Sequence, residues 1–82
     1  DGRLVRFGVI LRDQPGALAR LTALIAECRA NIVHIEHDRA FSHAAIGESR
    51  VELTLETAGA EQIAAVKQRL TEAGYGLEEP YS

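Results

Sequence analysis

The residues best suited to chemistry lie in one short stretch, RDQPGALARL, at positions 12–21. Asp13 offers a carboxylate, and the Pro15–Gly16 pair precedes an apolar pattern typical of a helix. Gly16 costs a helix about 1 kcal/mol relative to alanine, but the missing side chain lets another group approach the backbone closely. Amides at a helix start suit a carboxylate or phosphate. The stretch therefore predicts either a site for a small anion or amino acid, or only a tight strand-to-helix turn.

The same residues predict how the helix begins. Asp13 is expected to cap it, because its carboxylate can accept hydrogen bonds from the first backbone amides. Pro15 is expected in the first turn, where those amides have no helical partner in any case.

The histidines and the cysteine indicate neither a metal site nor a catalytic site. His34 and His37 are three residues apart on an expected strand, so they face opposite ways and cannot share a metal. His43 falls in an expected loop. Zinc needs about four ligands, so we expect no metal and read the histidines as surface residues. Cys28 falls on the apolar face of the expected helix and is interpreted as a small buried hydrophobe rather than a nucleophile.

Hydrophobic periodicity predicts the elements that must position these residues. Alternation indicates strands over 4–11, 31–40 and 51–56 and a short one near 75–77, whereas three- and four-residue spacings indicate helices near 17–28 and 63–70. The expected order is strand, helix, strand, strand, helix, strand. Right-handed crossovers then give a ferredoxin-like βαββαβ sandwich of the α+β class.

In this arrangement the antiparallel sheet has the strand order 4-1-3-2, and both helices cover one face. Val51, Leu53 and Leu55 should point inward, with Phe7 also facing the helices. The second strand lies at an edge, where its open hydrogen-bonding row could pair with another copy of the chain.

Composition narrows the possible functions. The 82 residues predict one domain, 1–82, and the net charge of −3 argues against nucleic acid as a partner. RNA-binding modules of the same topology need aromatic side chains on the open sheet face. The third strand has Glu52, Thr54 and Glu56 there instead.

The sequence also bears on where the chain functions. No apolar run reaches the roughly 20 residues of a membrane helix. A single cysteine favours a reducing, cytoplasmic setting, and the missing methionine suggests a module of a longer chain.

An enzymatic reading is the weaker alternative. Arg12 beside a helix start could cradle a phosphate, as in a small phosphatase. The third strand, however, offers no amide or acid suited to positioning a water, so we expect no catalytic residues in these 82 positions.

The string LRDQPGALARLTALIAECRANIVHIEHDRAF resembles the ACT domain family. The resemblance rests on Asp13-x-Pro15-Gly16-x-Leu18, the apolar helix, and Asn31-Ile32 about 15 residues later. It covers essentially the whole chain. The end of the second expected strand, HIEHDRAF, is similar to the C-terminal ACT modules of threonine dehydratases.

The resemblance implies a regulatory domain that binds an amino acid and is not itself an enzyme. The implied effector is isoleucine, with valine or threonine next, and the implied partner is a second ACT module in a homo-oligomer. Pyridoxal phosphate is implied for a separate catalytic domain, and no cofactor for this one. A ligand-free dimerisation module, or the ACT domain of another enzyme of amino-acid metabolism, is the alternative.

The family also implies where the effector would bind, between the loop after the first strand of one copy and the start of the second strand of another. The implied site residues are Leu11, Asp13, Gln14, Pro15, Gly16, Ala17, Leu18, Asn31, Ile32 and Val33. The amides near Gly16, Ala17 and Leu18 would receive the carboxylate, and Asp13 the ammonium group. Arg29 stands where relatives often have glycine at the helix end. We therefore expect the helix to end differently, with Ala30 or Asn31 making the turn.

Overall fold

The computed structural model describes residues 3–38 and 46–80. It contains six elements, in the order expected from the sequence. They are β1 (Arg3–Arg12), α1 (Ala17–Glu27), β2 (Asn31–Asp38), β3 (Glu48–Thr57), α2 (Ala60–Glu72) and β4 (Gly76–Glu78). The strand expected over 31–40 is described as far as Asp38; positions 39 and 40 lie outside the described residues, as does His43.

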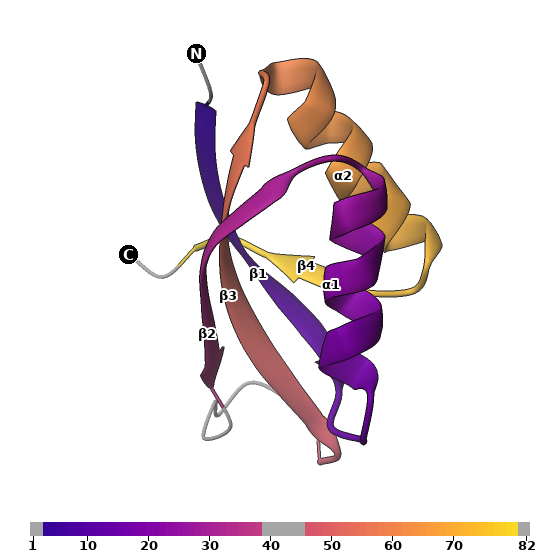
Figure 1. The fold of residues 1–82 in the computed structure, drawn as a ribbon. Coiled ribbons are helices and arrows are strands. Elements are labelled where there is room, and N and C mark those ends of the chain that lie inside the picture. Colours follow the sequence, from indigo (N-terminus) through magenta and orange to yellow (C-terminus); the bar gives the residue numbers. More distant parts are fainter. Residues whose placement is uncertain (1–2, 39–45, 81–82) are drawn as a thin grey trace.

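The sheet has the order β2-β3-β1-β4, which confirms the prediction. Its neighbouring strands are all antiparallel. Both helices lie on one face, and the other face is open (Figure 1). β2 forms one edge of the sheet, again as predicted.

The core lies between the sheet and the helices. Alternate residues of β3, Val51, Leu53 and Leu55, are fully buried, and Phe7 on β1 is buried opposite Leu53. The ammonium group of Lys67, on α2, lies 5.3 Å from the centre of the Phe7 ring, which confirms that Phe7 faces the helices. From the helix side the core is completed by Ala17, Leu21, Ile25, Val66 and Leu70.

Helix α1 begins differently from the prediction. It starts at Ala17, Gly16 is its N-cap, and no side chain makes a capping hydrogen bond. The expected Asp13 cap is therefore wrong, and Pro15 precedes the helix rather than standing in its first turn. Gly16 has a φ of 83°, a left-handed conformation that only glycine adopts without cost. The turn itself thus requires this glycine, whether or not a ligand approaches it.

The end of α1 also corrects an expectation. Arg29 has a φ of 62°, so this residue takes the left-handed conformation that usually belongs to glycine. Neither Ala30 nor Asn31 makes the turn. Gln62, on α2, holds the turn after α1 in place, because its side-chain amide donates to the carbonyl oxygen of Cys28 at 2.9 Å. Cys28 packs against the core, but it is only half-buried, less than predicted.

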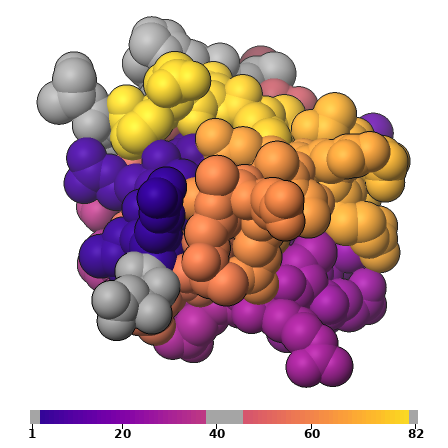
Figure 2. All heavy atoms as spheres, turned by 90° about the horizontal axis from the view of Figure 1, so that it is seen from above, coloured from indigo at the N-terminus to yellow at the C-terminus, as the bar shows by residue number. Residues whose placement is uncertain are grey.

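Figure 2 views the molecule from above, at the end where α1 leads into β2. The atoms of α2 (orange) lie there between the start of β1 (indigo) and the magenta segment. The loop between β1 and α1 lies at the opposite, lower end of the fold in Figure 1.

Candidate functional site

The loop between β1 and α1 forms one wall of a cavity of about 480 Å³, here called the loop cavity. Residues 11–19 line it together with His37 and Ser49. Seven of the ten residues implied by the resemblance lie here: Leu11, Asp13, Gln14, Pro15, Gly16, Ala17 and Leu18. The structure therefore brings together one complete segment of the implied site.

The remaining three residues, Asn31, Ile32 and Val33, do not line this cavity. They begin β2 at its far end, where Asn31 pairs with Glu56, whereas His37 pairs with Val51 beside the cavity. Six residues of extended chain span about 20 Å. Within one copy of the chain these two groups cannot contact the same small molecule.

Hydrogen bonds fix the shape of the loop. The Asp13 amide donates to the Gly47 carbonyl oxygen at 2.8 Å, which joins the loop to the start of β3. The Ala17 amide donates to the Gln14 carbonyl oxygen at 3.1 Å, so it is already occupied within the turn. Among the described residues, no backbone carbonyl accepts from the amides of Gly16, Leu18 or Ala19. These three donors, at the positive end of the α1 dipole, can bind an anion.

His37 and Ser49 form the wall opposite the loop. The Nε2 atom of His37 and the Oγ atom of Ser49 lie 3.0 Å apart and share a hydrogen bond. Ser49 is buried, with 2% of its surface exposed, and His37 comes from the neighbouring strand. The pair gives the cavity a polar side-chain surface that can donate and accept hydrogen bonds.

A β-bulge turns His37 toward this cavity. The register of β2 against β3 shifts between Ile32 and His34, which leaves Val33 as the extra residue. Because side chains alternate along a strand, one extra residue moves every later side chain to the other face. With the bulge, His37 lies opposite Val51, on the helix-facing side. Without it, His37 would lie opposite Arg50, on the open face.

Sequence reasoning missed both members of this pair. Ser49 could have been found, since it shares the inward parity of Val51, Leu53 and Leu55 on β3. His37 could not, because no residue type marks the bulge. His34 and His37 do face opposite sides of the sheet, as predicted. Among residues 3–38 and 46–80, no three His, Cys, Asp or Glu side chains are grouped so as to hold a metal ion.

A different set of charges occupies the open face of the sheet. Arg50 is buried there and forms ion pairs with Glu52 and with Glu78, the latter with Nε–Oε1 at 2.8 Å. It also donates to the Glu79 carbonyl oxygen at 2.8 Å. Arg6 lies 3.5 Å from the second Glu52 oxygen. Since each of these charges has a partner, the cluster fixes β4 and the residues after it on the sheet.

The model of the ACT domain family matches residues 5–74. An L-threonine ammonia-lyase of Geobacter sulfurreducens is 47% identical over 74 residues, which cover 90% of this chain and 18% of that protein. An L-threonine ammonia-lyase of Thermotoga maritima is 34% identical over 75 residues, 92% of this chain and 19% of that protein. The chain thus spans about a fifth of the length of these relatives.

Among solved structures, the ACT domain of a GTP pyrophosphokinase from Chlorobium tepidum has the same fold, with a TM-score of 0.70 at 16% identity. The match covers 96% of this chain and 95% of that one. None of the helices described here is long and apolar enough to cross a membrane.

Proposed function

Because the chain belongs to the ACT domain family, we propose that it is the amino-acid-binding regulatory domain of a threonine ammonia-lyase. Isoleucine is the first candidate effector, followed by valine and threonine. The observation that carries the proposal is the loop cavity, which combines the acidic residue Asp13 with three amides at the start of α1 that have no backbone acceptor among the described residues. An amino acid is a zwitterion and needs donors for its carboxylate beside an acceptor for its ammonium group.

The size and lining of the cavity support this proposal. Its volume of about 480 Å³ falls within the range of ordinary ligand sites. The effector carboxylate would accept from the amides of Gly16, Leu18 and Ala19. Asp13 would face the ammonium group, and the buried side chain of Leu11 offers apolar surface to an aliphatic side chain.

A second copy of the chain would complete the site. Asn31, Ile32 and Val33 lie too far from the loop cavity of their own chain, so they would contribute from a partner. Val33 has 53% of its surface exposed on the edge strand β2, where it is available for such a contact. Effector binding would then favour one arrangement of the two copies and so bias an attached catalytic domain.

Pyridoxal phosphate would belong to that catalytic domain. The cofactor is held through a lysine Schiff base. The single lysine of this chain, Lys67 on α2, lies over the ring of Phe7 on β1. These residues do not fit the cofactor, and the domain is proposed to act only through binding.

Thermal unfolding with added amino acids tests the proposal. Isoleucine at about 100 times its Kd should stabilise the chain by about 2.7 kcal/mol, and D-isoleucine, which cannot place the same three groups, should not. The shifts in melting temperature with valine and with threonine, compared with that for isoleucine, measure the preference for the effector side chain. If none of the twenty amino acids shifts the melting temperature while the chain self-associates, the ligand-free dimerisation module is the correct function.

A further inference from the structure

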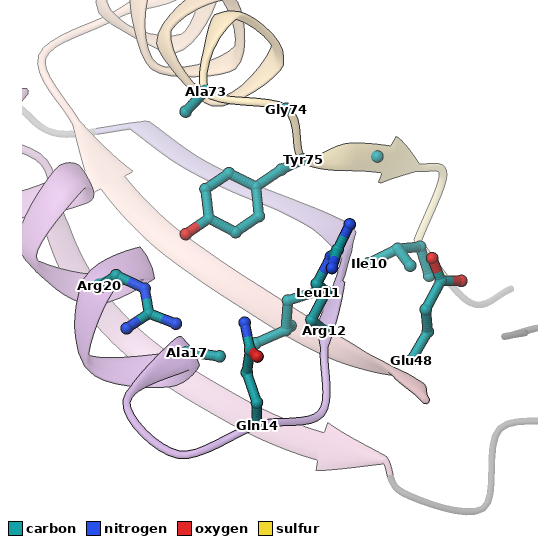
Figure 3. Close-up of a pocket in the computed structure, with 11 residues that line it drawn as sticks. Ile10, Leu11, Arg12, Gln14, Ala17, Arg20, Glu48, Ala73, Gly74 and Tyr75 are labelled. Carbon is teal, nitrogen blue, oxygen red and sulfur yellow. The ribbon is translucent and has the colours of Figure 1, made fainter. Parts of the chain in front are cut away.

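A second cavity, of about 500 Å³, lies on the other side of the loop between β1 and α1. We call it the arginine cavity, because Arg12 and Arg20 line it together with Gln14, Tyr75 and Glu48. In Figure 3 the side chains of Arg20, Gln14 and Tyr75 point toward a common space. Arg12 stands between that space and Glu48. The cavity is therefore bordered by two guanidinium groups, an amide and a phenol.

No acidic residue in the described part of the chain pairs with either guanidinium group. Within residues 3–38 and 46–80, neither Arg12 nor Arg20 makes a side-chain hydrogen bond or ion pair. Arg50, on the open face of the sheet, has several. Glu48, an acidic residue that also lines the cavity, lies on the far side of Arg12 from Arg20 in Figure 3.

The position of Arg20 adds to the unbalanced positive charge. Its Nη1 atom lies 3.1 Å from the point where a Cβ atom on Gly16 would stand, so the guanidinium folds back over the start of α1. The first turn of α1 carries no acidic residue. A cation at the positive end of a helix dipole is unfavourable unless an anion accompanies it. Arg12, Arg20 and the helix start thus all converge on the same cavity, with Arg20 on the α1 side and Arg12 on the β1 side.

From this convergence we propose that the arginine cavity binds a small organic phosphate, as a second ligand distinct from the amino-acid effector. Guanidinium groups present paired donors that match the oxygens of a phosphate. Gln14 and the Tyr75 hydroxyl would hydrogen-bond the organic part. The proposal does not depend on the amino-acid site, because Tyr75 and Gly76 line only the arginine cavity, and His37 and Ser49 line only the loop cavity.

The two ligands would influence each other. Four residues line both cavities: Leu11, Arg12, Gln14 and Ala17. A phosphate that orders this loop would change the affinity for the effector, and the effector would change the phosphate affinity by the same factor.

The test is a titration of the chain with inorganic phosphate, at constant ionic strength and without amino acid, followed by the NMR signals of the backbone amides. Saturable shifts at Gly74, Tyr75 and Gly76 are expected. Succinate and chloride at matched ionic strength serve as comparison anions. A saturable response to succinate but not phosphate, or equal responses to phosphate and chloride, would overturn the proposal.

Two double variants provide a matched comparison. One removes the two arginines of the arginine cavity, and the other removes two arginines outside it. Arg12→Gln with Arg20→Gln should weaken phosphate binding at least about tenfold. Arg3→Gln with Arg69→Gln removes the same charge from exposed positions outside the cavity and should leave the phosphate affinity unchanged. Equal phosphate affinities for the two double variants contradict the proposal. So do shifts confined to Asp13, His37 and Ser49, which would place the anion in the loop cavity.

Discussion

The guanidinium of Arg50 lies directly against the backbone of Gly8, on the open face of the sheet. A Cβ atom at position 8 would overlap the guanidinium group. Gly8 is opposite Glu52 on β3 and Glu78 on β4, the two acids that pair with Arg50. The Arg50 side chain therefore joins β3, β1 and β4. It can lie against β1 only because position 8 is a glycine.

Gly8→Ala should displace Arg50 from its partners and lower the free energy of unfolding by about 2 kcal/mol or more, because a buried ion pair is broken. Gly76→Ala is the matched control. It is a glycine of the adjacent strand, and its Cβ would make only an ordinary 3.5 Å contact with Ile10. Urea unfolding of both variants measures the difference, and equal stabilities would show that the Arg50 cluster contributes little.

Arg29→Gly should raise the free energy of unfolding by about 1 kcal/mol, since a left-handed residue with a Cβ atom costs about that much. Arg29→Ala removes the same side chain but keeps the Cβ atom, so it should not stabilise the chain. Denaturant midpoints distinguish the two variants. Equal stabilisation by glycine and alanine would trace the effect to loss of the guanidinium rather than to the backbone.

Ser49→Ala should weaken isoleucine binding by about tenfold, if the polar wall of the loop cavity contacts the effector. The loss of one buried hydroxyl also leaves His37 without its partner at 3.0 Å. Thr54→Ala, on the open face of the same strand, is the control. Calorimetric titration with isoleucine measures the affinities. An unchanged affinity in Ser49→Ala would remove this wall from the proposed site.

Val33→Lys should weaken self-association at least about tenfold, because a charge on an exposed edge strand opposes strand pairing. Leu4→Lys places the same charge on β1, at a position that is 65% exposed and not on the edge strand β2. Sedimentation over a range of concentrations compares the two variants with the original chain. A chain that stays monomeric at high concentration would rule out pairing through β2.

The fold followed from the sequence because its signals are local and agree with one another. The alternation of Val51, Leu53 and Leu55 and the spacing of Leu18, Leu21 and Ile25 left one economical topology. The conformations of the turns at the two ends of α1 could not be predicted from the sequence. Gly16 and Arg29 both adopt a positive φ, but only the glycine signals this by its type.

The candidate site followed only in part. The charge and the glycine of the stretch after the first strand left a ligand site and a plain turn both open, and the resemblance to the ACT family implied a site at residues 11–18. The structure shows that these residues line a cavity. Ser49 shares the inward parity of its strand, but its place beside that loop follows from the pairing of β1 with β3. That pairing joins positions more than 30 residues apart, and no local pattern encodes it.

The extra residue Val33 makes the wall of the loop cavity sensitive to an insertion in β2 as well as to substitutions. A slip of residues 34–38 by one position along β3 would bring Glu36 opposite Val51 in place of His37. A carboxylate would then face the cavity where an imidazole now stands, although no amino acid had been exchanged. In this strand a single inserted codon can therefore change the group that faces the cavity.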